Sequence, residues 1–201
     1  MRVKLRLEKN YTLFDELLPR EGRLLDLGCG YGFMSYMLHF AGPGRQITAI
    51  DYDEDKIEVA AHCFSKNERV SFGHADVREF VFERYAGIVV SDMLHYLEPS
   101  AQKAVLVKCI SSLNEGGVLV IRDGDADLQD RHRGTRFTEF FSTKVAAFNK
   151  TGGAGLSFFS GKVIRELAVA MDMDLLEIDN TRFTSNMIYV LTHKRTVHEP
   201  V

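Results

Sequence analysis

The sequence has no tryptophan, three cysteines and four prolines among its 201 residues. Cys29, Cys63 and Cys109 are widely spaced and form no CxxC pair, which argues against a zinc or dithiol redox centre and predicts free thiols in a reducing cytosol. No apolar run is long enough to cross a bilayer. Charges also interrupt the N-terminal MRVKLRLEKNYTLF, where a signal peptide needs a continuous hydrophobic stretch. We therefore expect a cytoplasmic protein without membrane insertion.

An excess of charge of one sign is also missing. The formal net charge is -3, and basic residues are scattered among acidic ones. This balance creates no field that would attract nucleic acid or an anionic membrane, so a small-molecule partner is favoured. Because hydrophobic residues make up 45% of a chain of this length, residues 1–201 are expected to bury one core and form a single domain.

What is present is a regular alternation of short apolar runs and longer segments of helical periodicity. This pattern predicts an α/β fold with a doubly wound, mostly parallel sheet and helices on both faces. Glycine and proline clusters mark the helix ends, and a short final connection favours an antiparallel last pair. Residues 1–22 are expected to form an N-terminal helical segment, and 123–159 an inserted substrate loop or lid. The expected strands are 23–26, 46–51, 70–74, 87–91, 117–122, 175–178 and 187–192, and the main helices are 32–41, 54–66, 101–113 and 161–171.

The stretch LLDLGCGYGF places Gly28, Gly30 and Gly32 directly after an expected strand and before a helix. Glycines at such a junction allow the backbone to approach a ligand closely. The dinucleotide fingerprint GxGxxG would require glycine at position 33, where this sequence has Phe33, so the nicotinamide interpretation is weakened. A simple tight turn remains the alternative for the glycines taken alone.

Acidic residues follow the next two expected strands. Asp51 ends the run ITAIDYD, where its carboxylate can accept both hydroxyls of a ribose, and Asp76 in SFGHADV can accept from an adenine amine while Val77 offers an apolar wall. Taken singly, Asp51 would serve equally well as a helix cap, and Asp76 as a solvated loop residue. The three features in this order favour an adenosine-binding site.

These motifs resemble those of the class I S-adenosylmethionine-dependent methyltransferases, from about Tyr11 to the C-terminus. The resemblance implies a seven-stranded Rossmann-like methyltransferase fold whose last strand is antiparallel, with S-adenosyl-L-methionine lying across the strand tips. It places Asp26 and the glycines at the methionine and ribose portion, and Ser91 and Asp92 beside the sulfonium. Tyr11 would close over the cofactor, although core packing is an equal alternative. The implied cofactor-binding residues are Tyr11, Asp26, Gly28, Cys29, Gly30, Gly32, Asp51, Tyr52, Asp76, Val77, Ser91 and Asp92.

The methyl acceptor has to be inferred from the loops beyond the fourth and fifth strands. Methyl transfer requires an aligned nucleophile and, for a hydroxyl acceptor, removal of its proton. The sequence has SDMLHYL where amino-directed nucleic-acid and glutamine methyltransferases carry an NPPY-like tetrad, and this stretch resembles that of small-molecule methyltransferases. The candidate bases are His95, Asp123 and His132, with a packing role as the alternative for His95. Tyr96 is expected to contact the acceptor.

The insertion supplies the remaining substrate candidates. Arg131, Arg133 and Arg136 would bind a carboxylate or phosphate, or else form a solvated surface. Phe137 and Phe141 belong to an apolar stripe that would cover a lipophilic acceptor, or merely dock a helix on the core. No metal is expected, because Leu128 and Gly134 replace the glycine and glutamate of a calcium loop.

The insertion also bears a narrower resemblance to methyltransferases of aryl polyene and flexirubin-type pigment pathways. It implies a phenolic acceptor on a long chain, tethered to an acyl carrier protein. The sequence thus predicts O-methylation of an aromatic or lipophilic small molecule. N- or C-methylation by the same fold, and a non-catalytic S-adenosylmethionine-binding module, remain the alternatives.

Overall fold

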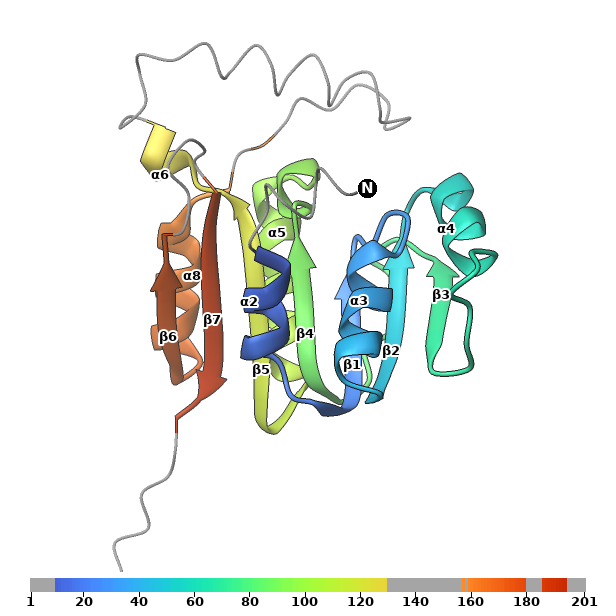
Figure 1. The fold of residues 1–201 in the computed structure, drawn as a ribbon. Helices are drawn as coiled ribbons and strands as arrows, with labels where there is room; N and C mark the ends of the chain where they lie inside the picture. The colour runs from blue at the N-terminus through green and yellow to red at the C-terminus, as the bar shows by residue number, and fades with distance from the viewer. Residues whose placement is uncertain (1–9, 130–156, 158, 180–185, 195–201) are drawn as a thin grey trace, which may run out of the picture.

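The computed structural model describes residues 10–129, 157, 159–179 and 186–194. They form one seven-stranded sheet with the strand order β3-β2-β1-β4-β5-β7-β6, in which β7 runs antiparallel to both of its neighbours and the other pairs are parallel (Figure 1). The α/β fold and its mostly parallel sheet are therefore confirmed. The strands are β1 (Glu21–Leu27), β2 (Gly44–Asp51), β3 (Val70–His74), β4 (Tyr85–Ser91), β5 (Leu113–Gly124), β6 (Met173–Ile178) and β7 (Asn186–His193).

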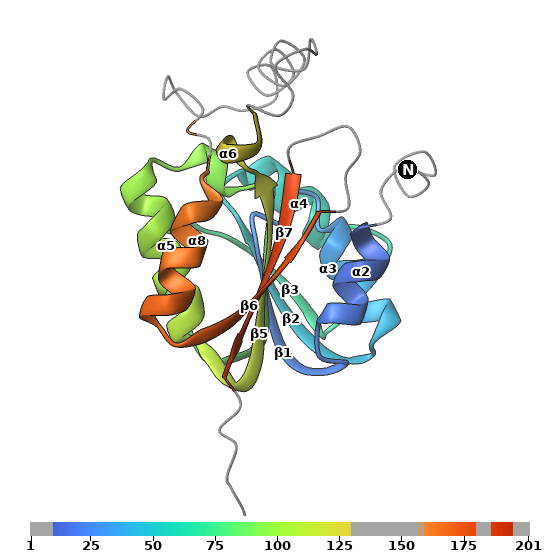
Figure 2. The same ribbon diagram turned by 90° about the vertical axis from the view of Figure 1, so that its left-hand side faces the viewer.

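Helices cover both faces of the sheet, with α2 and α3 on one side and α5 and α8 on the other (Figure 2). None of the helices in the described part of the chain is long and apolar enough to cross a lipid bilayer. The helices are α2 (Asn10–Leu17), α3 (Phe33–Ala41), α4 (Glu54–Ala61), α5 (Pro99–Ser111), α6 (Ala126–Gln129) and α8 (Gly161–Ala170), together with the 3₁₀ turn η1 (Leu94–Tyr96).

Strand β5 divides its side chains between the two helical layers. Leu119 and Ile121 belong to the core under α5 and α8, whereas Val120 belongs to the core under α2 and α3. Because side chains alternate along a strand, the next two residues also face opposite layers. Arg122 therefore lies on the α2 and α3 side, and Asp123 on the α5 and α8 side.

A buried arginine fixes α2 against the sheet. Arg45, at the start of β2, is fully buried and donates to the carbonyl oxygens of Leu18 and Leu38 at 3.1 and 2.7 Å, close to the C-terminal ends of α2 and α3. Its Nη1 also pairs with Asp15 at 2.6 Å. A cation at a helix C-terminus satisfies the last carbonyls and interacts favourably with the helix dipole. Arg45 thereby joins two helices to one strand.

The expected elements differ from the structure mainly at their ends. Helix α4 stops at Ala61 instead of residue 66, because a side chain of the following turn takes a backbone donor that the helix would need: Ser65 N donates to Cys63 Sγ at 3.3 Å. Strand β5 continues to Gly124 because residues 123 and 124 pair with β7, so the predicted insertion begins inside a strand. The predicted N-terminal helical segment, 1–22, is also too long. Helix α2 ends at Leu17 and β1 begins at Glu21, while residues 1–9 lie outside the described part.

Candidate active site at the carboxyl ends of the strands

The glycine turn between β1 and α3 leaves room for a ligand. Gly28 and Gly30 have φ values of 73° and 54°, in the left-handed region that favours glycine. A Cβ on Gly28 would lie 2.6 Å from Met93 Cγ, so this glycine is needed for the turn to pack on the loop after β4. A Cβ on Gly30 would meet nothing within 4 Å. The turn therefore packs on the protein at Gly28 and opens outward at Gly30.

Two carboxylates hold and border this turn. Asp51, at the end of β2, accepts from Gly30 N at 2.8 Å and from Asp53 N at 2.9 Å. Asp26, in β1, is buried and accepts from Ser35 Oγ at 2.5 Å. Burial, together with the nearby charge of Asp51, raises the pKa of Asp26 to about 6, although the bond from Ser35 opposes the rise. A cation bound beside the turn would stabilise both carboxylates.

The predicted adenine-binding residues lie along the same edge, beyond β2 and β3. Asp76 is paired with Arg78, whose Nη2 lies 2.5 Å from Oδ2, and the bond from Arg78 lowers the pKa of Asp76. Val77 is partly buried against the core, whereas Tyr52 is exposed. For Asp76 to accept from an adenine amine it would have to share its carboxylate with Arg78, a competition that the sequence analysis did not anticipate.

The loop after β4 begins with a charged pair. Asp92 has a φ of 54°, and its backbone N–H donates to the carbonyl oxygen of Arg122 at 2.8 Å. Its carboxylate pairs with Nη1 of the same arginine. Nε of Arg122 is buried and has no hydrogen-bond partner among the described residues. Ser91 Oγ is 3.4 Å from Asp92 Oδ2.

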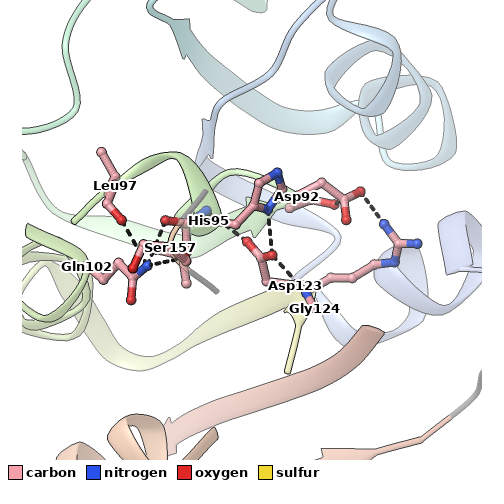
Figure 3. A network of polar contacts seen from close by, with 10 residues as sticks. Asp92, His95, Leu97, Gln102, Asp123, Gly124 and Ser157 are labelled. Carbon is pink, nitrogen blue, oxygen red and sulfur yellow. Dashed lines mark hydrogen bonds and ion pairs between the residues drawn. The ribbon is translucent and has the colours of Figure 1, made fainter. Parts of the chain in front are cut away.

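On the other side of the same loop, His95 and Asp123 form a buried pair (Figure 3). His95 Nδ1 lies 2.7 Å from Asp123 Oδ1, while the backbone N–H groups of Leu94 and Gly124 donate to Asp123 at 2.8 Å. A carboxylate facing Nδ1 holds the proton on that nitrogen, so neutral His95 presents Nε2 as an acceptor. Nε2 is buried and has no partner within the described residues.

The charge state of this pair is set by competing effects. Burial lowers the pKa of His95, but the hydrogen bond and the charge of Asp123, with a contribution from Asp92, raise it more, and the pKa ends above its ordinary value. Asp123 is 1% exposed and accepts three hydrogen bonds, so its carboxylate is fixed in place. Such an imidazole is both oriented and able to take up a proton.

The backbone of the His95 loop is fixed by a residue of α5. Gln102 is buried, and its Nε2 lies 3.0 Å from the carbonyl oxygens of Leu94 and Leu97 and 2.9 Å from that of Ser157 (Figure 3). Ser157 N also donates to the His95 carbonyl oxygen at 3.1 Å. Gln102 therefore connects the His95 loop to the segment that leads into α8.

The acidic run DGDAD has a structural role as well. Asp123 supports His95, and buried Asp125 accepts from Gly161 N at 3.1 Å and from Tyr189 Oη at 2.7 Å. A Cβ on Gly161 would lie 2.2 Å from Tyr189 Oη, so glycine is required there. Asp125 thus joins the end of β5 to the first residue of α8.

The structure brings together part of the predicted site. His95 and Asp123 are in contact, and the Tyr96 ring lies 4.1 Å from the His95 ring and is 39% exposed. Tyr11, in α2, lies with its ring 5.0 Å from that of Phe33. The remaining predicted residues lie outside the described part of the chain: Arg131, His132, Arg133, Arg136, Phe137 and Phe141.

Two residues at this edge were missed by the sequence analysis. Arg122 was treated only as the end of a strand, although an arginine that follows the apolar run VLVI was a visible signal. Gln102 carries no local signal, because its role depends on carbonyl groups of a different loop.

Comparisons with known proteins agree with the fold. A family model for a methyltransferase domain matches residues 24–117. Carboxy-S-adenosyl-L-methionine synthase from Aeromonas hydrophila is 31% identical over 51% of this chain and 43% of its own length. Malonyl-[acyl-carrier protein] O-methyltransferase from Bacillus cytotoxicus is 30% identical over 63% of this chain and 42% of its own. The chain thus spans less than half the length of these curated relatives.

A solved structure extends the likeness over most of the chain. N-methyltransferase NodS from Bradyrhizobium japonicum, in complex with S-adenosyl-L-homocysteine, superposes with a TM-score of 0.68 at 18% identity, covering 93% of this chain and 87% of that one. At this level of identity the similarity concerns the fold.

Proposed function

Because this chain belongs to the class I S-adenosylmethionine-dependent methyltransferase family, we propose that it transfers the methyl group of S-adenosylmethionine to a hydroxyl of a small aromatic acceptor. The observation that carries the proposal is the His95–Asp123 pair at the carboxyl ends of β4 and β5, in which the second imidazole nitrogen has no partner among the described residues.

The residues around the glycine turn fit this cofactor. Gly30 faces open space, and Asp51 at the tip of β2 has carboxylate oxygens suited to ribose hydroxyls. Asp26 is a buried carboxylate that forms no ion pair with any described residue, and a cationic ligand would stabilise its charged form. When bound, S-adenosylmethionine supplies an electrophilic methyl group on a positively charged sulfur. The turn then aligns the donor, and the loop after β4 borders the reacting end.

His95 is proposed as the general base. Asp123 holds Nδ1–H, so that Nε2 receives the acceptor proton, and the carboxylate then stabilises the imidazolium that forms. Phenols have pKa values near ~10, whereas carboxylic acids have values near ~4 and are already ionised at neutral pH. A base is therefore useful for a hydroxyl acceptor and unnecessary for a carboxylate.

The acceptor is proposed to be a phenol, presented either free or as a thioester on an acyl carrier protein. Tyr96 supports an aromatic acceptor, because its half-exposed ring lies directly beside that of His95. The carrier tether is supported only by the name of one relative that matches part of this chain, the malonyl-[acyl-carrier protein] O-methyltransferase. Roles for His132, the three insertion arginines and the two insertion phenylalanines remain predictions of the sequence.

The decisive experiment is a labelled-methyl transfer assay with His95→Ala. Phenols, free and carrier-bound, are offered beside carboxylic acids and amines. Because positioned acid–base catalysis contributes about 10²- to 10⁴-fold, kcat for the phenol should fall by at least about 10²-fold, with S-adenosylhomocysteine affinity unchanged. His62→Ala, which alters an exposed histidine at the C-cap of α4, is the matched control.

Three outcomes would contradict the proposal. Full turnover in His95→Ala would show that His95 is not the general base. Turnover of amines alone would favour N-methylation. Cofactor binding without transfer to any acceptor class would favour a non-catalytic binding module.

A further inference from the structure

The loop that follows β4 carries a second carboxylate near His95, that of Asp92. The two residues are close in the sequence, and the charge of Asp92 is one of the effects that raise the pKa of His95. Asp123 already lies 2.7 Å from the same imidazole. A further negative charge close to the ring would stabilise the imidazolium, and a protonated imidazole is unable to act as a base. The position of the Asp92 carboxylate therefore bears on the reaction assigned to His95.

The charges that act on His95 come from two places in the described part of the chain. Asp123 faces the ring from β5, and Asp92 lies at the start of the same loop. Helix α5 contributes the neutral amide of Gln102, the segment before α8 contributes a backbone N–H, and the adjacent ring is that of Tyr96. Since three hydrogen bonds fix Asp123, Asp92 is the carboxylate in this set that a neighbouring side chain can control.

Arg122 binds Asp92 through both its backbone and its side chain. The carbonyl oxygen of Arg122 accepts from Asp92 N at 2.8 Å, and its Nη1 pairs with the carboxylate. Asp92 has a φ of 54°, a conformation that persists in a residue other than glycine only where surrounding contacts hold it. The side chain of Arg122 is 11% exposed and that of Asp92 is 47% exposed. The buried guanidinium is therefore the fixed partner, and it determines where the more exposed carboxylate lies.

The two carboxylates near His95 lie on opposite sides of the sheet. Arg122 and the Asp92 carboxylate that it binds are on the α2 and α3 side, whereas Asp123 is on the α5 and α8 side with His95. Figure 3 shows the Asp92 side chain directed away from His95. The ion pair thus neutralises Asp92 and also keeps its carboxylate away from the imidazole.

We propose that Arg122 is a positioning residue that acts through Asp92, holding and neutralising this carboxylate so that Asp123 governs the protonation of His95. The catalytic meaning of this inference rests on the proposed function, in which His95 is the base. Without the guanidinium, the Asp92 carboxylate would be able to turn toward the ring. The imidazolium would then persist to higher pH, and a smaller fraction of the enzyme could accept a proton at neutral pH.

The test is an NMR titration of the His95 ring in the full chain, with its signals assigned by their absence from His95→Ala. In Arg122→Met the pKa of His95 should rise by about 0.5 to 1 pH unit, because a nearby negative charge favours the protonated ring. The backbone bond between residues 92 and 122 does not depend on the arginine side chain, so the loop keeps this anchor. Arg165→Met, which breaks the exposed Arg165–Glu177 pair, is the control and should leave the pKa of His95 unchanged.

Asp92→Asn separates an effect through Asp92 from a direct effect of the arginine charge. This substitution alone should lower the pKa of His95, because it removes a negative charge that raises it. In the Asp92→Asn background, Arg122→Met should shift the pKa of His95 less than half as much as it does in the wild type. Equal shifts in the two backgrounds would overturn the inference, since Arg122 would then act by its own charge.

Arg122→Lys covers the case in which the methionine variant does not fold. Lysine keeps the positive charge, although it lacks the planar fork that matches a carboxylate, so the pKa of His95 should stay closer to that of the wild type than it does in Arg122→Met. A pKa raised as much by lysine as by methionine would show that a cation at this position does not control Asp92, and it would overturn the inference.

Activity distinguishes this inference from the proposed function. If His95 is the base, the acid limb of the pH profile of kcat/KM for the phenol should move in Arg122→Met by the same amount as the pKa measured by NMR. A shift in the NMR titration without a shift in that limb supports the role of Arg122 and removes His95 as the base. An unchanged NMR titration in folded Arg122→Met overturns the inference, while the proposed function stands if His95→Ala still lowers kcat.

Discussion

Asp26 shows how a single buried group connects stability with ligand binding. Among the described residues its side chain accepts from Ser35 Oγ, and burial raises its pKa from 3.8 to about 6. A raised carboxyl pKa means that the protonated form stabilises the fold. That contribution is complete below pH 3.8 and is lost as the pH rises through about 6. At neutral pH the folded protein therefore bears the cost of a buried charge that a cationic ligand would reduce.

Replacing Asp26 with asparagine should separate the two effects. The asparagine variant carries no ionisable group at this position and so avoids the cost of burying a charge. Its free energy of unfolding, measured relative to that of the wild type, should therefore increase by about 2 kcal/mol between pH 4.5 and pH 7.5. S-adenosylhomocysteine affinity should fall. Chemical denaturation at the two pH values, together with calorimetry, measures both. A gain that does not depend on pH would show that the pKa of Asp26 is the same in the folded and unfolded states.

At the scale of elements, the loop after β4 depends on α5 for its shape. Gln102 places its side-chain amide on carbonyl groups of Leu94 and Leu97, on either side of His95, and on Ser157. Loops that carry functional groups are usually positioned by rigid neighbouring elements, and a buried carbonyl that loses its donor is destabilised. The orientation of His95 thus has two supports, Asp123 on its ring and Gln102 on its backbone.

Gln102→Met tests the second support with little change in volume. Loosening the loop should lower kcat/KM for the phenol about 10-fold, equivalent to about 1.4 kcal/mol, while S-adenosylhomocysteine affinity stays unchanged because the glycine turn is not touched. Lys103→Met, at an exposed neighbouring position on α5, serves as the control. Parallel losses of cofactor affinity and activity would indicate general destabilisation and count against a positioning role.

For the whole molecule, the glycine turn and Asp51 join the first two strands at the edge where the ligand is proposed to bind. A ligand that binds only the folded state stabilises it by mass action, by about 2.7 kcal/mol at a concentration of 100 times its Kd. For a chain of this size that corresponds to a rise in Tm of roughly 5–10 °C.

Thermal unfolding with and without S-adenosylhomocysteine measures this shift. Asp51→Asn should reduce it at the same ligand concentration, because an amide accepts ribose hydroxyls less well than a carboxylate does. Glu54→Gln, an exposed substitution in the first turn of α4, should leave the ligand-induced shift in Tm unchanged. An equal shift in the wild type and in Asp51→Asn would exclude Asp51 from the ligand site.

The sequence by itself determined the architecture in outline, apart from some element ends, and it predicted the edge of the sheet at which the donor would bind. Alternating apolar runs and glycine-rich junctions are local signals, because strand and helix periodicity are properties of consecutive residues. The final antiparallel pair was predicted from the short connection that precedes the last strand. The end of α4 was missed, because the Cys63 side chain accepts from the backbone of the following turn and competes with the helix.

Only the tertiary structure decided which chemical groups meet. His95 and Asp123 are 28 residues apart and pair because β4 and β5 are parallel neighbours whose carboxyl ends coincide. Arg122 and Asp123 are adjacent in sequence, yet strand alternation places one on the α2 and α3 side, where it pairs with Asp92, and the other on the opposite side, where it pairs with His95. The sequence named His95 and Asp123 as separate candidates and had no means of pairing them, since contact between distant residues depends on strand order, register and face.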